Sequence, residues 1–285
     1  MSAAPGQRRT AFWRRVPEAL GSSVRARGIA WRNHIAYAGG LVALLGDVAR
    51  KAARSITRRG GRVRAASLVQ QMVRVGVRSI PIVILVEFFI GIILALNLAP
   101  TLALYGQLER TADVVAIAIF RELGPLITAI ILSGFAGASI AAELGAMVEG
   151  EEIKALRAHA LDPIRFLVVP RVIATTVMMV ALVVLADVVG VFGGFVTGVF
   201  VLDINPHAYI DLTREALSIT DYLTGLVKAA IFGLLISGLA CYEGLHVRGG
   251  AEGVGRATTQ TVVKSIVMLI GADCCFTAAF YVLGW

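Results

Sequence analysis

Long apolar stretches without a single charge are the feature of this sequence that most restricts its fold. The run from Leu123 to Ala142 contains no charged residue, and further uncharged runs lie on both sides of Asp187. About 20 consecutive apolar residues are enough to cross the hydrocarbon core of a membrane. Since 57% of the residues are hydrophobic and only 16% are charged, the chain is predicted to be an integral membrane protein rather than a soluble domain.

These apolar runs predict five transmembrane helices. They are expected at residues 80–105, 114–147, 166–202, 222–245 and 262–285. An outer-membrane barrel would need strict alternation of polar and apolar residues, and these segments have no such pattern. The predicted fold class is therefore an all-α membrane bundle.

The distribution of Lys and Arg predicts the orientation of the bundle. Residues 1–79 contain 16 of the 27 basic residues, and the loops at 148–171 and 246–264 contain four and three more. Cytoplasmic flanks of membrane helices collect positive charge. The N-terminus and the loop at 148–171 are therefore expected in the cytoplasm, and Trp285 on the opposite side.

Residues 1–65 form a basic arm ahead of the membrane domain at 66–285. A basic arm can bind nucleic acid, but a position beside a membrane span favours anionic lipid headgroups, so no nucleic-acid partner is predicted. Within the arm, residues 35–56 place apolar side chains at helical spacing beside arginines. Because this stretch is too short to span a bilayer, it is predicted to be an interfacial helix.

Residues that could carry chemistry are few and scattered. Cys241, Cys274 and Cys275 lie in apolar segments and the four histidines are far apart, so no metal site is predicted. The phosphate-binding P-loop motif is missing, because the chain contains no Gly-Lys pair. The glycine-rich stretch 249–255 is interpreted as a cytoplasmic loop. We expect no catalytic residue, no cofactor bound by this chain, and no enzymatic activity of its own.

Small residues at helical spacing predict close packing of helices. Gly190, Gly194 and Gly198 repeat every four residues in the third span, and Gly134 and Gly137 belong to similar stripes in the second. Such stripes let two helix backbones approach closely in lipid. Packing within the chain and a seam between two copies both fit this pattern.

Four charged residues are expected inside the spans, namely Glu87, Asp187, Lys228 and Asp273. Charges in the bilayer are costly and usually serve a function. A Lys228–Asp273 pair between the fourth and fifth spans would partly neutralise both groups. A proton relay, by contrast, would need a chain of such groups at successive depths.

An acidic and amphipathic segment follows the second span. Residues 149–158 include Glu149, Glu151 and Glu152, with Ile153 and Leu156 on one face. The segment is predicted to be a short cytoplasmic helix, either a solvated linker or a docking helix for a soluble partner. A membrane protein that is driven by ATP but lacks its own ATP site would need such a docking helix.

Two stretches resemble the signature regions of one family. The sequences RELGPLITAIILSGFAGASIAAELGAMVEGEEIKALRAHALDPIRFLVVPRVIA (121–174) and GAEGVGRATTQTVVKSIVMLIGADCCFTAAF (250–280) are similar to those of the MlaE/YrbE permeases, the membrane subunits of MCE-associated ABC transporters. The resemblance covers residues 66–285 and identifies them as a permease domain.

The resemblance implies a homodimer that moves phospholipid or a related hydrophobic lipid between the membrane and a ring of MCE-domain subunits. It also implies a separate ABC ATPase that binds ATP and Mg, with a small STAS-type accessory subunit as a further candidate partner. The implied location is the inner (plasma) membrane of a bacterium with the N-terminus in the cytoplasm, or alternatively the inner envelope membrane of an organelle.

The resemblance also assigns candidate residues to two sites. The ATPase-coupling helix would contain Glu149, Glu151, Glu152, Ile153, Ala155 and Leu156. The lipid cavity would be walled by the first span at Glu87, Phe88, Phe89, Ile92, Leu96 and Asn97. Many relatives have a small residue near position 87 and a glutamine near position 97, which leaves the identity of the lipid open. Lys154 replaces an acidic or polar residue of the coupling helix and could tune which ATPase docks.

Two other functions also fit the residues. An ion- or proton-coupled carrier would use Glu87, Asp187 and Asp273 and would need no ATPase. If the chain were a scaffold that only anchors an MCE ring, substitution of the small residues in 190–198 would alter assembly but not lipid movement.

Overall fold

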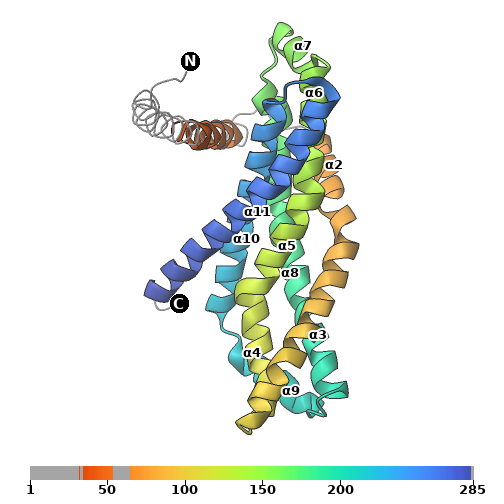
Figure 1. Cartoon of the computed structure of the whole chain (residues 1–285), viewed down its shortest axis with the longest axis vertical. Coiled ribbons are helices and arrows are strands. Elements are labelled where there is room, and N and C mark those ends of the chain that lie inside the picture. The colour runs from red at the N-terminus through yellow and green to blue at the C-terminus, as the bar shows by residue number, and fades with distance from the viewer. Residues whose placement is uncertain (1–31, 33–34, 54–64, 284–285) are drawn as a thin grey trace, which may run out of the picture. The chain divides into compact units, whose positions relative to one another are not determined.

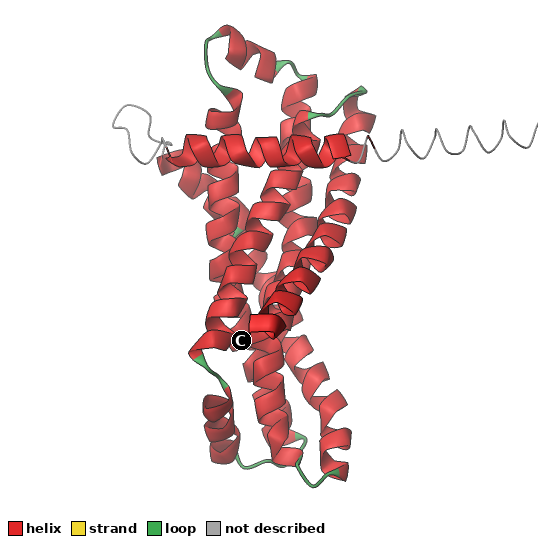
Figure 2. Cartoon of the chain, turned by 90° about the vertical axis from the view of Figure 1, so that its left-hand side faces the viewer, coloured by secondary structure: helices red, strands yellow, loops and turns green. Residues whose placement is uncertain are grey.

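The structure is a computed structural model that describes residues 32, 35–53 and 65–283. Figure 2 shows that the described part of the chain consists of helices joined by short loops. The chain divides into two units, Met1–Gly46 and Asp47–Trp285, and all candidate membrane spans lie in the second. A helix covers residues 35–53. Residues 54–56 of the predicted interfacial helix lie outside the described residues, as does most of the predicted basic arm.

Five helical segments among the described residues of the second unit are long and apolar enough to cross a membrane, which confirms the predicted fold class. They are Ala66–Leu104, Leu108–Glu149, Ile164–Phe200, Ile219–Leu245 and Gly250–Leu283. The first and last begin earlier than predicted, at 66 rather than 80 and at 250 rather than 262. Both helices continue into more polar sequence, which still favours helix although it is not apolar enough to be recognised as a span.

The spans are built from helices with local interruptions. The first is α2 (Ala65–Val75) and α3 (Ile80–Leu104), and the second is α4 (Thr111–Ala118), α5 (Gly124–Leu132) and α6 (Ala138–Glu149). The remaining spans are α8 (Val169–Phe200), which follows a π-helical turn at Ile164–Val168, then α10 (Ile219–Leu245) and α11 (Gly250–Leu283). Two short helices, α7 (Glu152–Ala158) and α9 (Pro206–Ala216), lie at opposite ends of the bundle (Figure 1).

Glycines bring the backbones of α3 and α8 into direct contact. A Cβ atom on Gly91 would lie 1.9 Å from the backbone oxygen of Gly190, and one on Gly193 would lie 2.2 Å from the backbone oxygen of Phe88. Neither position can hold a larger residue without moving a helix, because the obstacle is backbone. This contact fixes the first span against the third.

The glycine stripe of the third span is filled by the chain itself. Gly190 faces Ile119, and both Gly194 and Gly198 face the buried ring of Tyr209 on α9. The stripe therefore packs within one chain and does not form an open seam for a second copy. Burial in this contact raises the pKa of Tyr209.

The two glycines singled out in the second span differ from each other. Gly137 packs against α10, because a Cβ there would lie 3.4 Å from a side-chain methyl of Ile236. Gly134 is exposed, and a Cβ there would meet nothing within 4 Å. Gly134 therefore packs against no other helix within this chain, and its predicted packing role stays a prediction for contact with a second copy.

Gly91→Ala is expected to destabilise the protein, whereas Gly134→Ala is not. Overpacking of a tight contact costs about 1–3 kcal/mol, and it outweighs the gain of about 0.5–1 kcal/mol from replacing a helical glycine with alanine. At Gly134 an added methyl group would overpack nothing, so only the gain from replacing a helical glycine is expected. Thermal unfolding of both purified variants in detergent measures the difference, and equal midpoints would contradict the close contact of α3 with α8.

Candidate functional site

A cluster of charged residues lies inside the bundle around Lys228 of α10, which is 1% exposed. Its Nζ atom lies 2.6 Å from Oε2 of Glu122 and 2.9 Å from Oδ1 of Asp273 on α11. It also donates to Oγ1 of Thr277 at 3.2 Å. Three spans thus meet at one ammonium group, which has two carboxylates as counterions.

Local sequence explains how Glu122 reaches this position. Pro125 has no backbone N–H, so it cannot bond the carbonyl of Arg121 as the regular helix would require. The chain responds with a π-helical turn over Ile119–Leu123, in which the N–H of Gly124 bonds the carbonyl of Ile119. Such turns occur frequently at functional sites, and this one carries both Arg121 and Glu122.

A cavity of about 170 Å³ opens beside the cluster. It is lined by Arg121, Glu122, Thr224, Lys228, Thr277, Phe280 and Tyr281. Arg121 is held in place by Asp221 at the start of α10, with Nε 2.7 Å from Oδ1. The cavity combines charged groups with two aromatic rings, so it can accommodate a polar group attached to an apolar body.

Two further buried carboxyl groups form a separate site. Glu87 is 0% exposed and Asp187 is 2% exposed. One oxygen of Glu87 accepts a hydrogen bond from Thr128 at 3.2 Å. Among the described residues, Oε2 of Glu87 and Oδ1 of Asp187 have no hydrogen-bond partner. Asp273 belongs to the Lys228 cluster instead, so the three acids expected for a coupled carrier are divided between two sites.

The candidate lipid-facing residues of the first span do not share one environment. Phe89 and Leu96 are 51% and 43% exposed, and Ile92 is half-buried between them on the same face. Phe88 packs against Phe192 with ring centroids 6.1 Å apart. Asn97 is exposed and donates to the carbonyl of Ile93. Glu87 does not fit the lipid-facing role expected from the sequence, because it is fully buried within the chain.

The acidic segment after the second span forms a turn before it forms a helix. The second span continues to Glu149, and Glu151 adopts a left-handed conformation with φ of 60°. The helix α7 therefore begins at Glu152, three residues later than predicted. Lys154 lies 2.6 Å from Oε1 of Glu151 and lowers the pKa of that carboxyl group.

The end of α7 has the geometry of a Schellman motif. Ala160 is left-handed with φ of 56°, its N–H donates to the carbonyl of Arg157, and the N–H of Leu161 donates to the carbonyl of Leu156. Beyond this end, burial tends to raise the pKa of Asp162, but the neighbouring Lys51 ammonium outweighs it, and the pKa lies below its ordinary value. These contacts fix both ends of the segment.

The surface of α7 is mostly polar and exposed. Ile153 is buried at 6% exposure and anchors the helix, and Leu156 is half-buried. Glu149, Glu151, Glu152 and Ala155 are exposed. An open hollow of about 510 Å³ lies between this turn and the loop that joins α10 to α11. It is lined by Val148, Glu149, Glu151, Lys154, Leu245, His246, Val247, Arg248 and Gly249.

Sequence reasoning missed Glu122 as an intramembrane charge. The sequence did contain a pattern that could have identified Glu122, because Arg121 and Glu122 interrupt an otherwise apolar segment. Charges inside membrane spans are candidates for a function. Within the part of the chain that the structure describes, no group of three or more His, Cys, Asp or Glu could hold a metal ion. The contacts that the structure gives at the Lys228 cluster are ion pairs and hydrogen bonds.

Five apolar spans in the described part of the chain, with an ion-paired polar cavity beside them, define a multi-pass helical membrane protein. The family model described as Permease MlaE matches residues 68–279. The chain belongs to the MlaE permease family.

Several relatives carry names that describe their function. A probable ABC transporter permease protein of Rickettsia prowazekii is 39% identical over 214 residues, which is 75% of this chain and 83% of the relative. The intermembrane phospholipid transport system permease protein MlaE of Haemophilus influenzae is 32% identical, over 76% of this chain and 84% of that protein. The chloroplastic protein TRIGALACTOSYLDIACYLGLYCEROL 1 of Arabidopsis thaliana is 32% identical, over 78% and 63%.

Proposed function

We propose that this chain is the permease subunit of an ABC transporter that moves phospholipid between the membrane and a ring of MCE-domain subunits. The family match over residues 68–279 carries this proposal. The name of the Haemophilus influenzae relative, which specifies intermembrane phospholipid transport, supports phospholipid as the cargo. ATP and Mg would bind to a separate ATPase, and this chain would catalyse no covalent step.

In this proposal α7 and the turn before it are the contact with the ATPase. The exposed carboxylates of Glu149, Glu151 and Glu152 suit a partner with complementary positive charge. Ile153 ties α7 to the bundle, so a push on the helix would reach the spans. The hollow beside the turn offers a place for a protruding side chain of the partner.

The Lys228 cluster would hold the polar part of the lipid during transport. A lipid phosphate could compete with Glu122 and Asp273 for the ammonium group, and the aromatic rings of Phe280 and Tyr281 would contact the apolar part. The exposed face of α3 at Phe89, Ile92 and Leu96 would meet acyl chains or a second copy of the permease. The working unit would be a homodimer, to which a small STAS-type subunit would bind as an accessory.

The proposed location is the inner membrane of a bacterium, with the N-terminus and α7 in the cytoplasm. The excess of Lys and Arg in residues 1–79 supports this orientation. The alternative location is the inner envelope membrane of an organelle, because one relative is chloroplastic.

Purification of the tagged chain in mild detergent tests the proposal. Mass spectrometry of the eluate is expected to find an ATPase, MCE-domain proteins and stoichiometric phospholipid. A chain that carries no lipid and instead dissipates an ion gradient in vesicles would favour the coupled carrier, for which the unpartnered carboxyl oxygens of Glu87 and Asp187 are the supporting observation. A complex that contains MCE proteins but moves no lipid would favour the scaffold.

A further inference from the structure

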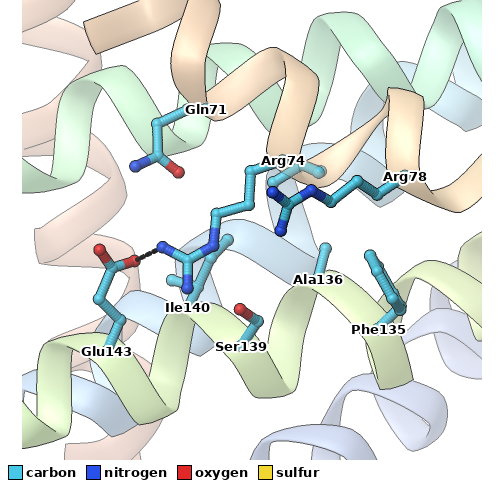
Figure 3. A pocket seen from close by; sticks show the side chains of 9 residues that line it. Gln71, Arg74, Arg78, Phe135, Ala136, Ser139, Ile140 and Glu143 are labelled. Carbon is cyan, nitrogen blue, oxygen red and sulfur yellow. Dashed lines mark ion pairs between the residues drawn. The ribbon is translucent and has the colours of Figure 1, made fainter.

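A second polar pocket lies between the first and second spans, apart from the Lys228 cluster. It occupies about 160 Å³ between α2, the turn that follows it, and α6 (Figure 3). It is lined by Gln71, Arg74, Val75, Arg78, Phe135, Ala136, Ser139, Ile140 and Glu143. None of these residues belongs to the sites described above.

The pocket has an excess of positive charge. Glu143 is its one carboxylate, and it is shared by two guanidinium groups: Nη1 of Arg74 lies 2.8 Å from Oε2, and Nη2 of Arg171 lies 3.0 Å from Oε1. Arg78 contributes a third guanidinium, which is exposed and forms no ion pair with any described residue. Two guanidinium groups of the pocket thus accompany one carboxylate, which Arg171, outside the lining, already shares, and an anionic ligand would restore the balance.

The side chains converge on one space. Figure 3 shows the guanidinium group of Arg78 pointing toward the side chain of Arg74, whose own guanidinium group points to Glu143. Gly76 lies between the end of α2, which carries Arg74, and the short turn Val77–Ser79, which carries Arg78. Both arginines line the same volume, and forked donors of this kind suit the oxygens of a phosphate group.

An unused acceptor indicates a further part of the ligand. Oε1 of Gln71 is buried and has no hydrogen-bond partner among the described residues. A buried acceptor without a donor is costly, so a ligand that brings an N–H or O–H group beside its phosphate would satisfy it. Amine and hydroxyl groups are the usual substituents of a phosphodiester headgroup.

The rim of the pocket is apolar and exposed. Phe135 is 43% exposed, and Val77, next to Arg78, is 49% exposed. A soluble anion would gain nothing from these side chains, whereas the acyl chains of a lipid would cover them. Charge in the pocket and apolar surface beside it together match an amphipathic ligand.

We propose that this pocket binds the phosphodiester headgroup of a phospholipid. Arg74 and Arg78 donate to the phosphate, Oε1 of Gln71 accepts from the headgroup amine or hydroxyl, and the acyl chains pass over Phe135 and Val77. Arg78 and Phe135 are exposed on this chain, which leaves the pocket open to a bilayer lipid. The inference deepens the proposed function, since it names a second place where the permease would hold its cargo, but binding here requires neither ATP nor a partner.

Photo-crosslinking tests the proposal on the full chain. A photoreactive phenylalanine analogue replaces Phe135, and the protein is placed in vesicles of a phosphate-free galactolipid that contain a minor fraction of phosphatidylethanolamine. We expect crosslinks to phosphatidylethanolamine well above its share of the lipid. Arg78→Gln is expected to reduce their yield about tenfold, since a charge-assisted contact of this kind is worth a factor of at least ten in affinity. Arg78→Lys should retain part of the yield.

Arg256→Gln is the matched control. It removes the same charge from an exposed arginine that forms an ion pair with Glu252, away from this pocket, and its crosslink yield should equal that of the parent protein. Equal yields from Arg78→Gln and Arg256→Gln would overturn the site. Crosslinks to phosphatidylethanolamine no more frequent than its share of the lipid would overturn the lipid assignment. No ATPase is present, so a failure of the transport proposal would not change these yields.

Discussion

Lys228→Met is expected to lower the free energy of unfolding by about 3–5 kcal/mol, because it leaves two carboxylates without their shared counterion. Glu122 and Asp273 both lie within 3 Å of the Lys228 ammonium, at 2.6 and 2.9 Å. Methionine fills a similar volume, so the loss reports the charge rather than a cavity. Thermal unfolding of the purified chain in detergent measures it as a drop in the midpoint.

Two comparisons separate the ion-pair effect from a general effect of removing lysine. Lys154→Met breaks a pair with Glu151 in which both side chains are at least 70% exposed, and exposed pairs contribute only about 0–1 kcal/mol. Asp273→Asn added to Lys228→Met should recover part of the stability by removing one of the orphaned charges. Equal losses from Lys228→Met and Lys154→Met would show that the buried cluster does not hold the spans together.

The spans could be predicted from the sequence because the thickness of the hydrocarbon core sets a minimum apolar length. The same criterion fails where a helix continues beyond the apolar region. The stretch 249–255 was interpreted as a loop on account of its glycines, yet α11 begins at Gly250. A Cβ on Gly253 would lie 2.2 Å from the backbone oxygen of Arg248, so this glycine serves a close contact inside a helix. Local composition could not distinguish that role from flexibility.

The other differences between the sequence-based predictions and the structure arise from how the helices pair in space. Lys228 and Glu122 are 106 residues apart in the chain, and nothing in the sequence fixes which faces of their helices meet. The pair of Lys228 with Asp273 was suggested by their charges, but the third member was missed because Glu122 lies beside Arg121 at the edge of an uncharged run. The family resemblance placed Glu87 on the wall of the lipid cavity, and a resemblance along one span does not reveal which of its side chains the other spans cover.

Leu156→Asp is expected to reduce ATP-dependent lipid transport at least tenfold while the chain still inserts and folds. The side chain is half-buried on α7, on the surface proposed to meet the ATPase. A carboxylate buried there without a partner costs about 2–5 kcal/mol of binding, which corresponds to a factor of at least ten. Transport of fluorescent phospholipid between vesicles, by the permease reconstituted with its ATPase, measures the effect.

Leu161→Asp controls for damage to the helix itself. Its backbone N–H closes the end of α7 on the carbonyl of Leu156, and its side chain is 46% exposed beyond the helix. A new carboxylate at this position perturbs the same helix end but lies outside the proposed contact, so transport should stay near the parent level. The two variants should also differ in how much ATPase they retain on purification. If both lost transport and ATPase equally, the intact end of α7 would be the requirement, and Leu156 would have no specific role in docking.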